Sequence, residues 1–431
     1  MFRGGQDNFD VLAGPVPNEG TKPEDVETQI ASDLAQASPG DRERAYFDLH
    51  GIPNVWSETP QLIQQNLERM DQKVQGIRYK VAFEMAEAQS SRYVRDRELR
   101  LTFLRADMFD ANKAALRFAR FFQAKLDLFG QEKLALNITQ DDLDHDDMML
   151  LNSGYGRFLE QPDQTGRPVA VLFFNEEQLN FNIISLLRQV YYSIMIASKN
   201  VEFQRGGVVA IVYGLGDSAN CDKGSEIAWK MAKLAQVLPM RLAAIHVCYE
   251  SLVWKPILST GIASFDTFCR LRVRTHHGPQ HEVATKLRGF GIAPSTFPAA
   301  HGERLLEDPN YRVRLRNQRK VERLSQSARR NAIHIPSDYD VLLGKGFSAQ
   351  NHFGNKEFRQ LVVSRQSVYD SAEKGSKLQI AQGIVDIVHQ SSGMFLKQED
   401  KLWIPVDNSV ARTKVSAAFR TLRLDKKAKD K

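Results

Sequence analysis

The 431-residue chain is long enough for about three domains of ~150 residues each, or for one large domain and a small one. Hydrophobic residues make up 42% and aromatic residues 9% of the chain, which excludes a wholly disordered protein, and no apolar run approaches the ~18 residues of a transmembrane helix. The net charge of +6 is the sum of two unlike parts of the chain. Residues 1–300 carry 33 basic and 37 acidic side chains, whereas residues 301–431 carry 25 basic and 15 acidic ones. A basic part of this kind attracts the phosphates of nucleic acids or anionic lipids.

Residues 1–53 are rich in Gly, Pro, Asp and Glu without periodicity, which predicts a mostly disordered leader with a short helix near residues 28–36. The first residues resemble neither a secretion signal nor an organelle transit peptide, so we expect a cytoplasmic location, free or peripheral to membranes. Residues 54–130 predict a helical N-terminal lobe, because apolar side chains recur three and four positions apart from Ile63 to Val81. We expect this stripe to pack on its own domain, and pairing with a partner helix is the alternative.

Residues 131–303 change to short apolar runs that alternate with helices. Continuous apolar runs are typical of strands that are buried on both faces. Strands that alternate with helices of 10 to 15 residues predict an α/β fold with a parallel sheet and crossover helices. The expected strands are 167–174, 207–214 and 241–249, and the expected helices are 181–198, 225–237 and one from about residue 251.

The sequence lacks the nucleophile elbow, the zinc-protease helix motif and the phosphate-binding loop of common enzyme classes. Gly214-Leu215-Gly216 follows a predicted strand, but Ala219 replaces the third glycine of a dinucleotide-binding loop. The acidic run 141–147 lacks the spacing and central glycine of a calcium loop, and adjacent His276 and His277 point to opposite faces of a strand. The three cysteines, without C-x-x-C spacing, predict neither a disulfide framework nor a zinc site. We therefore expect a non-enzymatic protein without a metal or cofactor.

Six segments stand out in this part of the chain: L-T-F-L-R-A-D-M-F-D-A-N-K-A at 101–114, G-R-P-V at 166–169, G-G-V-V-A-I-V-Y-G-L at 206–215, L-P-M-R-L-A-A-I-H-V at 238–247, W-K-P-I-L at 254–258 and L-R-G-F-G-I to F-P at 287–298. In this order they resemble elements of the CRAL-TRIO lipid-binding family, and the resemblance covers about residues 84–303. Tyr213 stands where the family usually has Asp, and residues 248–250 replace its usual Asn-Ala/Thr-Pro turn, so the ligand is not inherited. The resemblance implies a helical lobe packed on an α/β lobe, whose sheet floors an apolar cavity closed by a mobile gate helix at about residues 251–268.

Apolar side chains on the predicted helix 181–198 and strand 207–214 are candidates to line such a cavity, although most residues of this kind simply pack on one another. The resemblance adds gate residues that face the lipid and basic residues that meet a phosphoinositide head group, for which ordinary surface charge is the alternative. The expected partners are a hydrophobic lipid or phospholipid and an anionic membrane surface. The candidates are Tyr191, Tyr192, Ile194, Met195, Val208, Ala210 and Val212 for the cavity, Val253, Ile257, Phe265 and Phe268 for the gate, and Lys255, Arg270 and Arg272 for the head group.

The last part of the chain begins with a basic linker, predicted over residues 304–334, in which eight Arg and Lys side chains and one acid fall between residues 311 and 330. Residues 335–423 are then similar to a small domain of unknown function that is abundant in diatom proteins. The similarity rests on D-V-L-L-G-K-G at 340–346, N-H-F-G-N at 351–355, F-R at 358–359, G-M-F-L-K at 393–397 and A-R-T-K-V-S at 411–416.

This segment predicts a separate small α+β domain of two helices, a hairpin and a basic last helix, followed by a basic tail at 424–431. Such a plan is common in nucleic-acid or peptide docking, which makes Arg412, Lys414 and Arg420 candidates for contact with nucleic acid. Solvated surface charge is the alternative. A protein partner is also compatible with this domain, and a nuclear location stays open.

The sequence therefore predicts binding of a hydrophobic lipid in an apolar cavity, with transfer or sensing of that lipid, and a basic C-terminal module for localisation or partner recruitment. One alternative is a nucleic-acid-associated regulator that acts through its C-terminal domain. A second alternative is a scaffold whose cavity has collapsed. A co-purified lipid favours the first interpretation, and salt-sensitive retention on duplex DNA favours the regulator.

Overall fold

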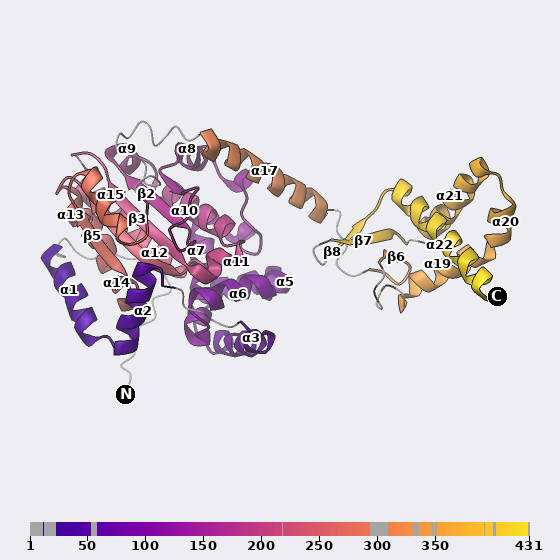
Figure 1. The fold of residues 1–431 in the computed structure, drawn as a ribbon, viewed down its shortest axis with the longest axis horizontal. Coiled ribbons are helices and arrows are strands. Elements are labelled where there is room, and N and C mark those ends of the chain that lie inside the picture. The colour runs from indigo at the N-terminus through magenta and orange to yellow at the C-terminus, as the bar shows by residue number, and fades with distance from the viewer. Residues whose placement is uncertain are drawn as a thin grey trace. The chain divides into compact units, whose positions relative to one another are not determined.

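The computed structural model contains two compact units, Met1–Arg316 and Asn317–Lys431, and each has its own apolar core (Figure 1). Within the described residues, no helix combines enough length and hydrophobicity to cross a bilayer. The structure describes residues 12, 23–52, 58–217, 219–293, 309–330, 336–344, 346, 349, 351–391, 393–399 and 402–429.

The helical lobe of the first unit has an aromatic core. Helix α7 begins after Asp110, whose carboxylate accepts hydrogen bonds from the first free backbone N–H groups of the helix. Phe118, Phe121 and Phe122 of α7 are almost fully buried, and Phe103 packs edge-on against Phe118 with ring centroids 4.9 Å apart. The lobe consists of α3 (Pro60–Gln75), α4 (Val81–Gln89), α5 (Ser91–Val94), α6 (Arg97–Ala106) and α7 (Ala111–Phe129), followed by η1 (Gln131–Lys133), η2 (Gln140–Asp142) and α8 (His145–Ser153).

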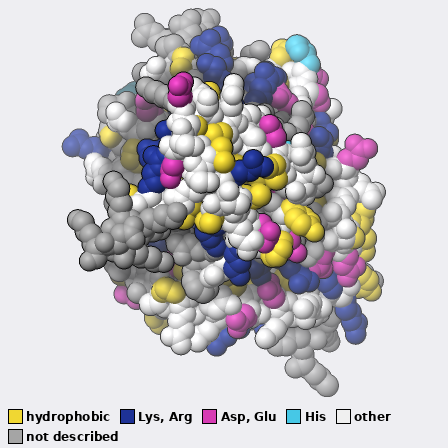
Figure 2. Space-filling model, turned by 90° about the vertical axis from the view of Figure 1, so that its right-hand side faces the viewer, with side chains coloured by type: hydrophobic (Ala, Val, Ile, Leu, Met, Phe, Trp, Pro, Cys, Tyr) yellow, Lys and Arg dark blue, Asp and Glu magenta, His cyan; other side chains and the backbone are white. Residues whose placement is uncertain are grey.

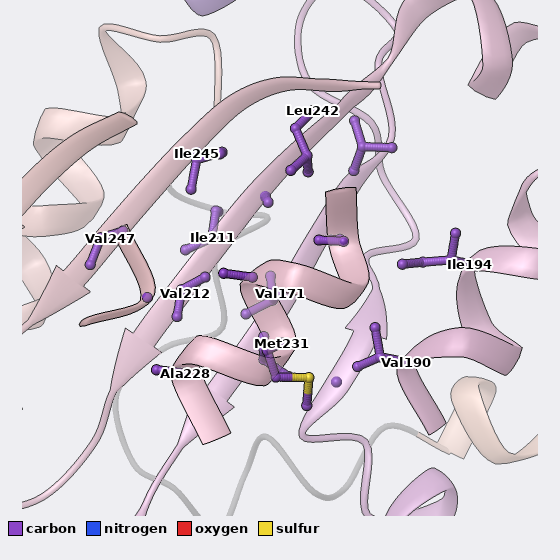
Figure 3. A pocket seen from close by; sticks show the side chains of 18 of the residues that line it. Val171, Val190, Ile194, Ile211, Val212, Ala228, Met231, Leu242, Ile245 and Val247 are labelled. Atoms are coloured by element: carbon purple, nitrogen blue, oxygen red, sulfur yellow. The ribbon is translucent and has the colours of Figure 1, made fainter. Parts of the chain in front are cut away.

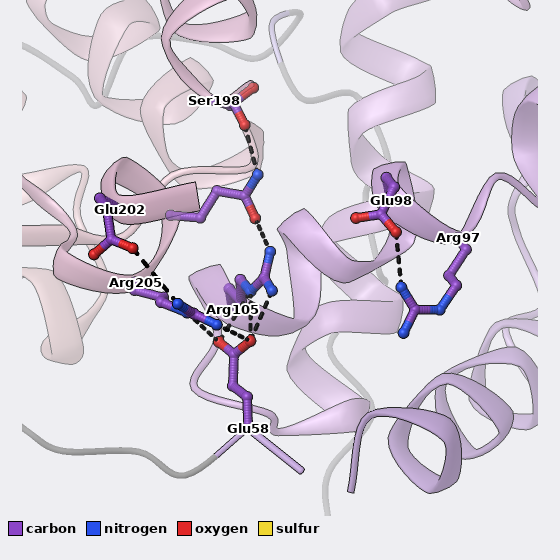
Figure 4. Close-up of polar contacts among 8 residues, drawn as sticks. Glu58, Arg97, Glu98, Arg105, Ser198, Glu202 and Arg205 are labelled. Atoms are coloured by element: carbon purple, nitrogen blue, oxygen red, sulfur yellow. Dashed lines mark hydrogen bonds and ion pairs between the residues drawn. The ribbon is translucent and has the colours of Figure 1, made fainter. Parts of the chain in front are cut away.

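A buried ion network fixes the helical lobe on the α/β lobe (Figure 4). The guanidinium of Arg105, on α6, donates hydrogen bonds to Glu58 at 3.0, 3.2 and 2.7 Å and another to Gln204 at 2.5 Å. Gln204 in turn donates to the carbonyl of Ser198, while Arg205 donates to Glu58 at 3.1 Å. Burial would raise the pKa of Glu58, but the hydrogen bonds from the two arginines outweigh it and lower that pKa. The network therefore stays ionised near neutral pH.

Five strands form the central sheet in the order β1-β2-β3-β4-β5, with β1 antiparallel to β2 and the others parallel. Since the parallel strands follow one another in chain order and crossovers are right-handed, the intervening helices lie on one face of the sheet. The strands are β1 (Gly156–Phe158), β2 (Val169–Phe174), β3 (Val208–Gly214), β4 (Leu242–Tyr249) and β5 (Val273–His277). The helices between them are α9 (Glu176–Leu179), α10 (Ile183–Ala197), α11 (Val201–Gly206), α12 (Cys221–Val237), α13 (Trp254–Ala263) and α14 (Thr267–Arg270), and α15 (Gln280–Arg288) follows β5.

Both faces of the sheet are covered, which explains why its strands are continuous apolar runs. Val209 and Ile211 of β3 point away from the crossover helices and pack with Leu49 and Leu287, which precede and follow the sheet in sequence. The alternate residues of β3, including Ala210, point toward the crossover helices. The predicted parallel sheet with crossover helices is therefore present as a mixed α/β architecture.

The prediction of a mostly disordered leader over residues 1–53 is wrong for two segments, which form α1 (Pro23–Gln36) and α2 (Pro39–His50), although the short helix expected near residues 28–36 lies within α1. The rest of the predicted leader lies outside the described residues, apart from Leu12, Gly51 and Ile52. The predicted basic linker likewise contains a helix, α17 (Pro309–Arg330). Tyr311 of α17 is buried, and its hydroxyl donates to the carbonyl of Leu151 at 2.8 Å.

The second unit is a three-stranded sheet covered by helices, with β6 parallel to β7 and β7 antiparallel to β8. Phe358, Phe395 and Phe419 lie in its core. The predicted helices and hairpin are present, the strand β6 was not predicted, and the last helix extends over much of the predicted basic tail. The elements are β6 (Val341–Leu343), α19 (Phe353–Ser364), α20 (Gln366–Ser371), α21 (Lys374–Gln390), β7 (Phe395–Glu399), β8 (Leu402–Pro405) and α22 (Asn408–Lys429).

Candidate ligand cavity

An apolar cavity of about 150 Å³ lies between the sheet and the crossover helices α10, α12 and α13. Figure 3 shows Val212 and Ile245 on the strands, and Val190, Ile194 and Met231 on the helices, around this space. The polar side chains among its lining residues are few and include Gln189, which donates to the carbonyl of Gly156 at 2.6 Å. The cavity can therefore hold hydrocarbon but offers little to bind a polar group.

The exposure of side chains along the central strands indicates where the cavity lies. Ala170 and Leu172 of β2, and Ala210 and Val212 of β3, are only partly buried although they lie in the middle of a sheet that is covered on both faces. Their neighbours on the opposite face, such as Val209, are fully buried. Since native interiors normally leave few voids of this size, the unfilled space over these four residues is a specific feature of this lobe.

The strand candidates and one gate candidate lie at the cavity. Val208, Ala210 and Val212 line its floor, and Phe265 lines its wall beyond the end of α13. The candidate Ile194 also lines it. The alternation of side chains along a strand is sufficient to bring the three β3 residues together on one face.

The other apolar candidates lie elsewhere. Tyr191 stacks on Phe121 of the helical lobe with ring centroids 5.8 Å apart, and the hydroxyl of Tyr192 accepts a hydrogen bond from Gln140 at 3.0 Å. The face of α10 that meets the cavity instead contains residues 189, 190, 193 and 194, which are spaced as one side of a helix. Met195, Val253, Ile257 and Phe268 are likewise not among the residues that line the cavity.

Helix α12 supplies a cavity wall that the sequence analysis missed. Ala228, Met231, Ala232 and Ala235 line the cavity at positions three and four apart, which is the spacing of one helix face. This pattern of small and flexible apolar residues was visible in the sequence, but it is also typical of ordinary helix packing. The sequence therefore contained a signal for a buried face and none for an empty space beside it.

Each of the three head-group candidates is paired with a carboxylate from α1 or α2. Lys255 lies 3.2 Å from Glu27, and Arg270 lies 2.6 Å from Asp33. Arg272 lies 2.7 Å from Asp48, which also pairs with Arg241. The side chain of Arg272 is 1% exposed, so it is a structural partner of Asp48 in this structure rather than a surface cation. Burial lowers the pKa of Arg272, and the Asp48 carboxylate acts in the opposite direction.

Two histidines form a buried pair on the far face of the sheet. His246 Nδ1 lies 3.0 Å from His276 Nε2, and Phe290 packs against both rings. Burial, reinforced by nearby positive charge, lowers the pKa of His246 to about 3 and that of His276 to about 4. Both rings are therefore neutral near pH 7. Within the described part of the chain, no group of three or more His, Cys, Asp or Glu residues is placed to hold a metal ion.

The nucleic-acid candidates lie on α22 but not on one face of it. Arg412 donates to Gln382 at 2.6 Å, and Lys414, two positions further, points elsewhere around the helix. Arg420 donates to the backbone carbonyl of residue 416. Burial, and then the nearby charge of Arg359, lower the pKa of Lys414. Figure 2 shows Lys and Arg side chains scattered among apolar and acidic ones over the face in view.

The signature residues of the C-terminal segment stabilise its fold. Asp340 accepts hydrogen bonds from the backbone N–H groups of residues 337 and 394 at 2.6 and 2.7 Å. The side chain of Asn355 donates to and accepts from the backbone of Leu342, at 2.9 and 2.6 Å. A Cβ on Gly354 would lie 2.2 Å from the carbonyl oxygen of Asp340, so only glycine fits there. The contacts of Asp340, Gly354 and Asn355 within the domain therefore account for these three positions of the motif.

Comparison with known families agrees with this C-terminal segment. Residues 340–421 match a family model described as a domain of unknown function (DUF6824). No CRAL-TRIO family model matches the chain, so the resemblance of residues 84–303 to that family remains a hypothesis. No curated protein matches the chain.

Proposed function

We propose that the first unit binds a hydrophobic ligand, a lipid acyl chain or a similar hydrocarbon, in the cavity over β2, β3 and β4. The partly buried side chains of Ala170, Leu172, Ala210 and Val212 at the centre of the sheet are the observation that carries this proposal. Each methylene moved from water into such a lining stabilises the complex by about 0.8 kcal/mol. Binding of a hydrocarbon makes and breaks no covalent bond, so we propose that the protein acts as a carrier or sensor and not as an enzyme.

The size of the cavity limits what it holds in this conformation. Its volume of about 150 Å³ is below the range of about 300–1,000 Å³ that is typical of ligand pockets. A second hollow of about 320 Å³ lies on the other side of α13, and Val247, Leu258 and Ile262 line both. Displacement of α13 side chains toward the second hollow would enlarge the first, so a long acyl chain requires movement of α13.

Loading of the cavity tests the proposal. Gently isolated protein, analysed by native mass spectrometry, should carry a bound lipid or take up a fatty acid added to it. Val212→Asp should abolish uptake, because a carboxylate that faces hydrocarbon is strongly disfavoured. Val81→Asp, the same change at a side chain that is 61% exposed on the helical lobe, should leave uptake unchanged. Folded protein that takes up no hydrocarbon, with or without the substitution, would instead favour a scaffold with a collapsed cavity.

We also propose that the second unit localises the protein or recruits a partner through its basic surface. The excess of basic side chains supports an anionic partner, because residues 301–431 carry 25 basic and 15 acidic side chains. If that partner is nucleic acid, Lys414→Gln in the full chain should weaken retention on duplex DNA and reduce its dependence on salt. If Lys414→Gln leaves retention on duplex DNA unchanged, or if the chain is retained equally on anionic vesicles, Lys414 does not bind nucleic acid specifically.

A further inference from the structure

Helix α1 lies across α13 and α14, the segment that closes the ligand cavity (Figure 1). Two ion pairs hold it there: Glu27 with Lys255 at 3.2 Å, and Asp33 with Arg270 at 2.6 Å. Burial would raise the pKa of Asp33, but hydrogen bonds from Arg270 and Gln29 outweigh this effect and lower it. Both carboxylates are charged near neutral pH, and α1 is held by these two ion pairs together with one buried apolar side chain, Val26, which belongs to the core of the first unit.

The packing beneath α1 is incomplete. The hollow of about 320 Å³ is lined on one side by Val26, Ile30 and Leu34 of α1 and on the other by residues of β4, β5 and α13. Contacts that a filled interface would make are absent across this space, so α1 gains less from dispersion than a well-packed helix would. A helix held by two ion pairs and one buried apolar side chain over a hollow detaches at lower cost than one whose whole inner face is embedded in a core.

Helix α2 contrasts with α1 because it is anchored deeply. Its Asp48 is buried and pairs with Arg241 and Arg272, and its Leu49 is fully buried. His50, at its end, stacks on Phe290 with ring centroids 5.2 Å apart. The two helices are separated by residues 37 and 38 alone. α1 can therefore move about this short connection while α2 stays in place.

The face beneath α1 combines hydrocarbon with positive charge. Leu258, Ile262 and Val273 form its apolar floor, and Lys255 and Arg270 stand at its edge. An anionic bilayer offers the complementary chemistry, because its phosphates attract cations and its acyl region accepts apolar side chains. A nucleic acid would satisfy the two cations and leave the apolar floor without a partner.

We propose that α1 is a detachable strap that covers a docking face for an anionic lipid bilayer. Lipid phosphates replace the carboxylates of Glu27 and Asp33 on Lys255 and Arg270 when the protein docks. Since α13 is the wall between the two hollows, departure of the strap also gives α13 room to move. This inference goes beyond ligand binding in the cavity and does not require the cavity to be loaded.

Vesicle binding by the full chain tests the strap. The variant Glu27→Gln/Asp33→Asn keeps the size of both side chains and removes both ion pairs. The matched control, Glu87→Gln/Glu98→Gln, removes the same charge and two exposed ion pairs on the helical lobe. Co-sedimentation is measured with phosphatidylcholine vesicles that contain about 30% phosphatidylserine, and with phosphatidylcholine alone.

The strap variant should bind the anionic vesicles about 25-fold more tightly than the unaltered chain, because each freed cation near the surface contributes about fivefold. The control variant should change far less, and adding Lys255→Gln to the strap variant should reverse most of the gain. Hydrogen exchange should show faster exchange in α1 and unchanged protection in α2. An equal gain for the control, a gain on neutral vesicles of the same size, or unchanged exchange in α1 would overturn the proposal.

A cavity-filled variant separates this proposal from ligand binding. Ala210→Leu, placed on the sheet floor, should block hydrocarbon uptake without changing vesicle binding by the strap variant. Loss of uptake with intact vesicle binding would leave the strap proposal standing. Vesicle binding that disappears when the cavity is filled would overturn it, because docking would then depend on the ligand rather than on the face beneath α1.

Discussion

Filling the cavity with protein should stabilise the first unit. Ala210 lies on the sheet floor and faces the cavity, so Ala210→Leu places a larger side chain in the empty space. At about 24 cal/mol per Å³, an empty apolar cavity of about 150 Å³ costs about 3–4 kcal/mol. The added carbons recover part of this cost, and after some strain we expect the free energy of unfolding to rise by about 1–2 kcal/mol.

The same substitution on the opposite face provides a matched control. Ala244 of β4 pairs in register with Val209 of β3, and its side chain is fully buried on the face without a cavity. Ala244→Leu should therefore overpack a filled core and lower the free energy of unfolding by about 1–3 kcal/mol. The two substitutions are chemically identical, so their opposite effects on the free energy of unfolding depend only on the presence of the cavity on one face of the sheet.

Urea unfolding of the full chain, followed by tryptophan fluorescence and far-UV circular dichroism, measures both effects. The slope of the free energy against urea should be unchanged, so that the shift of the midpoint reports stability alone. If Ala210→Leu destabilises the unit as much as Ala244→Leu does, the space over the sheet is not available in solution. The first unit would then have no cavity of this kind in solution, and hydrocarbon binding would lose its structural basis.

Two further predictions concern buried charge. The pKa values of His246 and His276, about 3 and about 4, lie below the ordinary 6.5, so the unfolded chain binds more protons and stability falls as the pH drops below about 6.5. The free energy of unfolding in urea should be about 2 kcal/mol per histidine lower at pH 5 than at pH 7. His246→Leu/His276→Leu should reduce this difference, and an equal difference in the variant would contradict the lowered pKa values. Asp48→Asn leaves Arg241 and Arg272 buried without their carboxylate and should cost about 3–5 kcal/mol in thermal or urea unfolding, whereas a loss below 1 kcal/mol would show that α2 is anchored otherwise.

The central strands could be predicted from the sequence because their burial on both faces makes each a continuous apolar run. The run 167–174 begins two residues before β2, and 207–214 and 241–249 begin one residue before β3 and β4. The edge strands β1 and β5 gave no such signal, since β1 has three residues and β5 contains Arg274 and two histidines. Short edge strands with polar side chains are not distinguishable from loops by periodicity.

The helices α1 and α2 could not be predicted as packed elements because their partners are remote in sequence. Asp48 pairs with Arg241 and Arg272, which are about two hundred residues further along the chain. Within the first fifty residues, its local surroundings are those of a solvated acidic segment. The same remoteness made Arg272 a candidate head-group ligand, because a cation that awaits phosphate and one that binds a distant carboxylate have the same sequence pattern.

The rotation of α10 about its axis and the presence of an empty cavity could not be predicted from the sequence and are seen only in the three-dimensional structure. The strand pattern alone places Val208, Ala210 and Val212 on one face, since side chains alternate with a period of two. A largely apolar helix such as 183–197 has no polar face to fix its rotation, and its tyrosines turned out to meet the helical lobe. A void has no sequence signature at all, because the residues that surround it are the same apolar residues that would fill a solid core.

The two proposals are coupled through α13, and the coupling has a fixed sign. Leu258 and Ile262, on one face of α13, line both the ligand cavity and the hollow beneath α1 and separate the two spaces. If release of α1 lets α13 move and so strengthens hydrocarbon binding by some factor, a bound hydrocarbon must favour release of α1 by the same factor. A loaded protein would then dock on anionic bilayers more readily than an empty one. Bound hydrocarbon would thus modulate docking by the unaltered chain, whereas the strap variant, in which α1 is already released, would dock with or without a ligand.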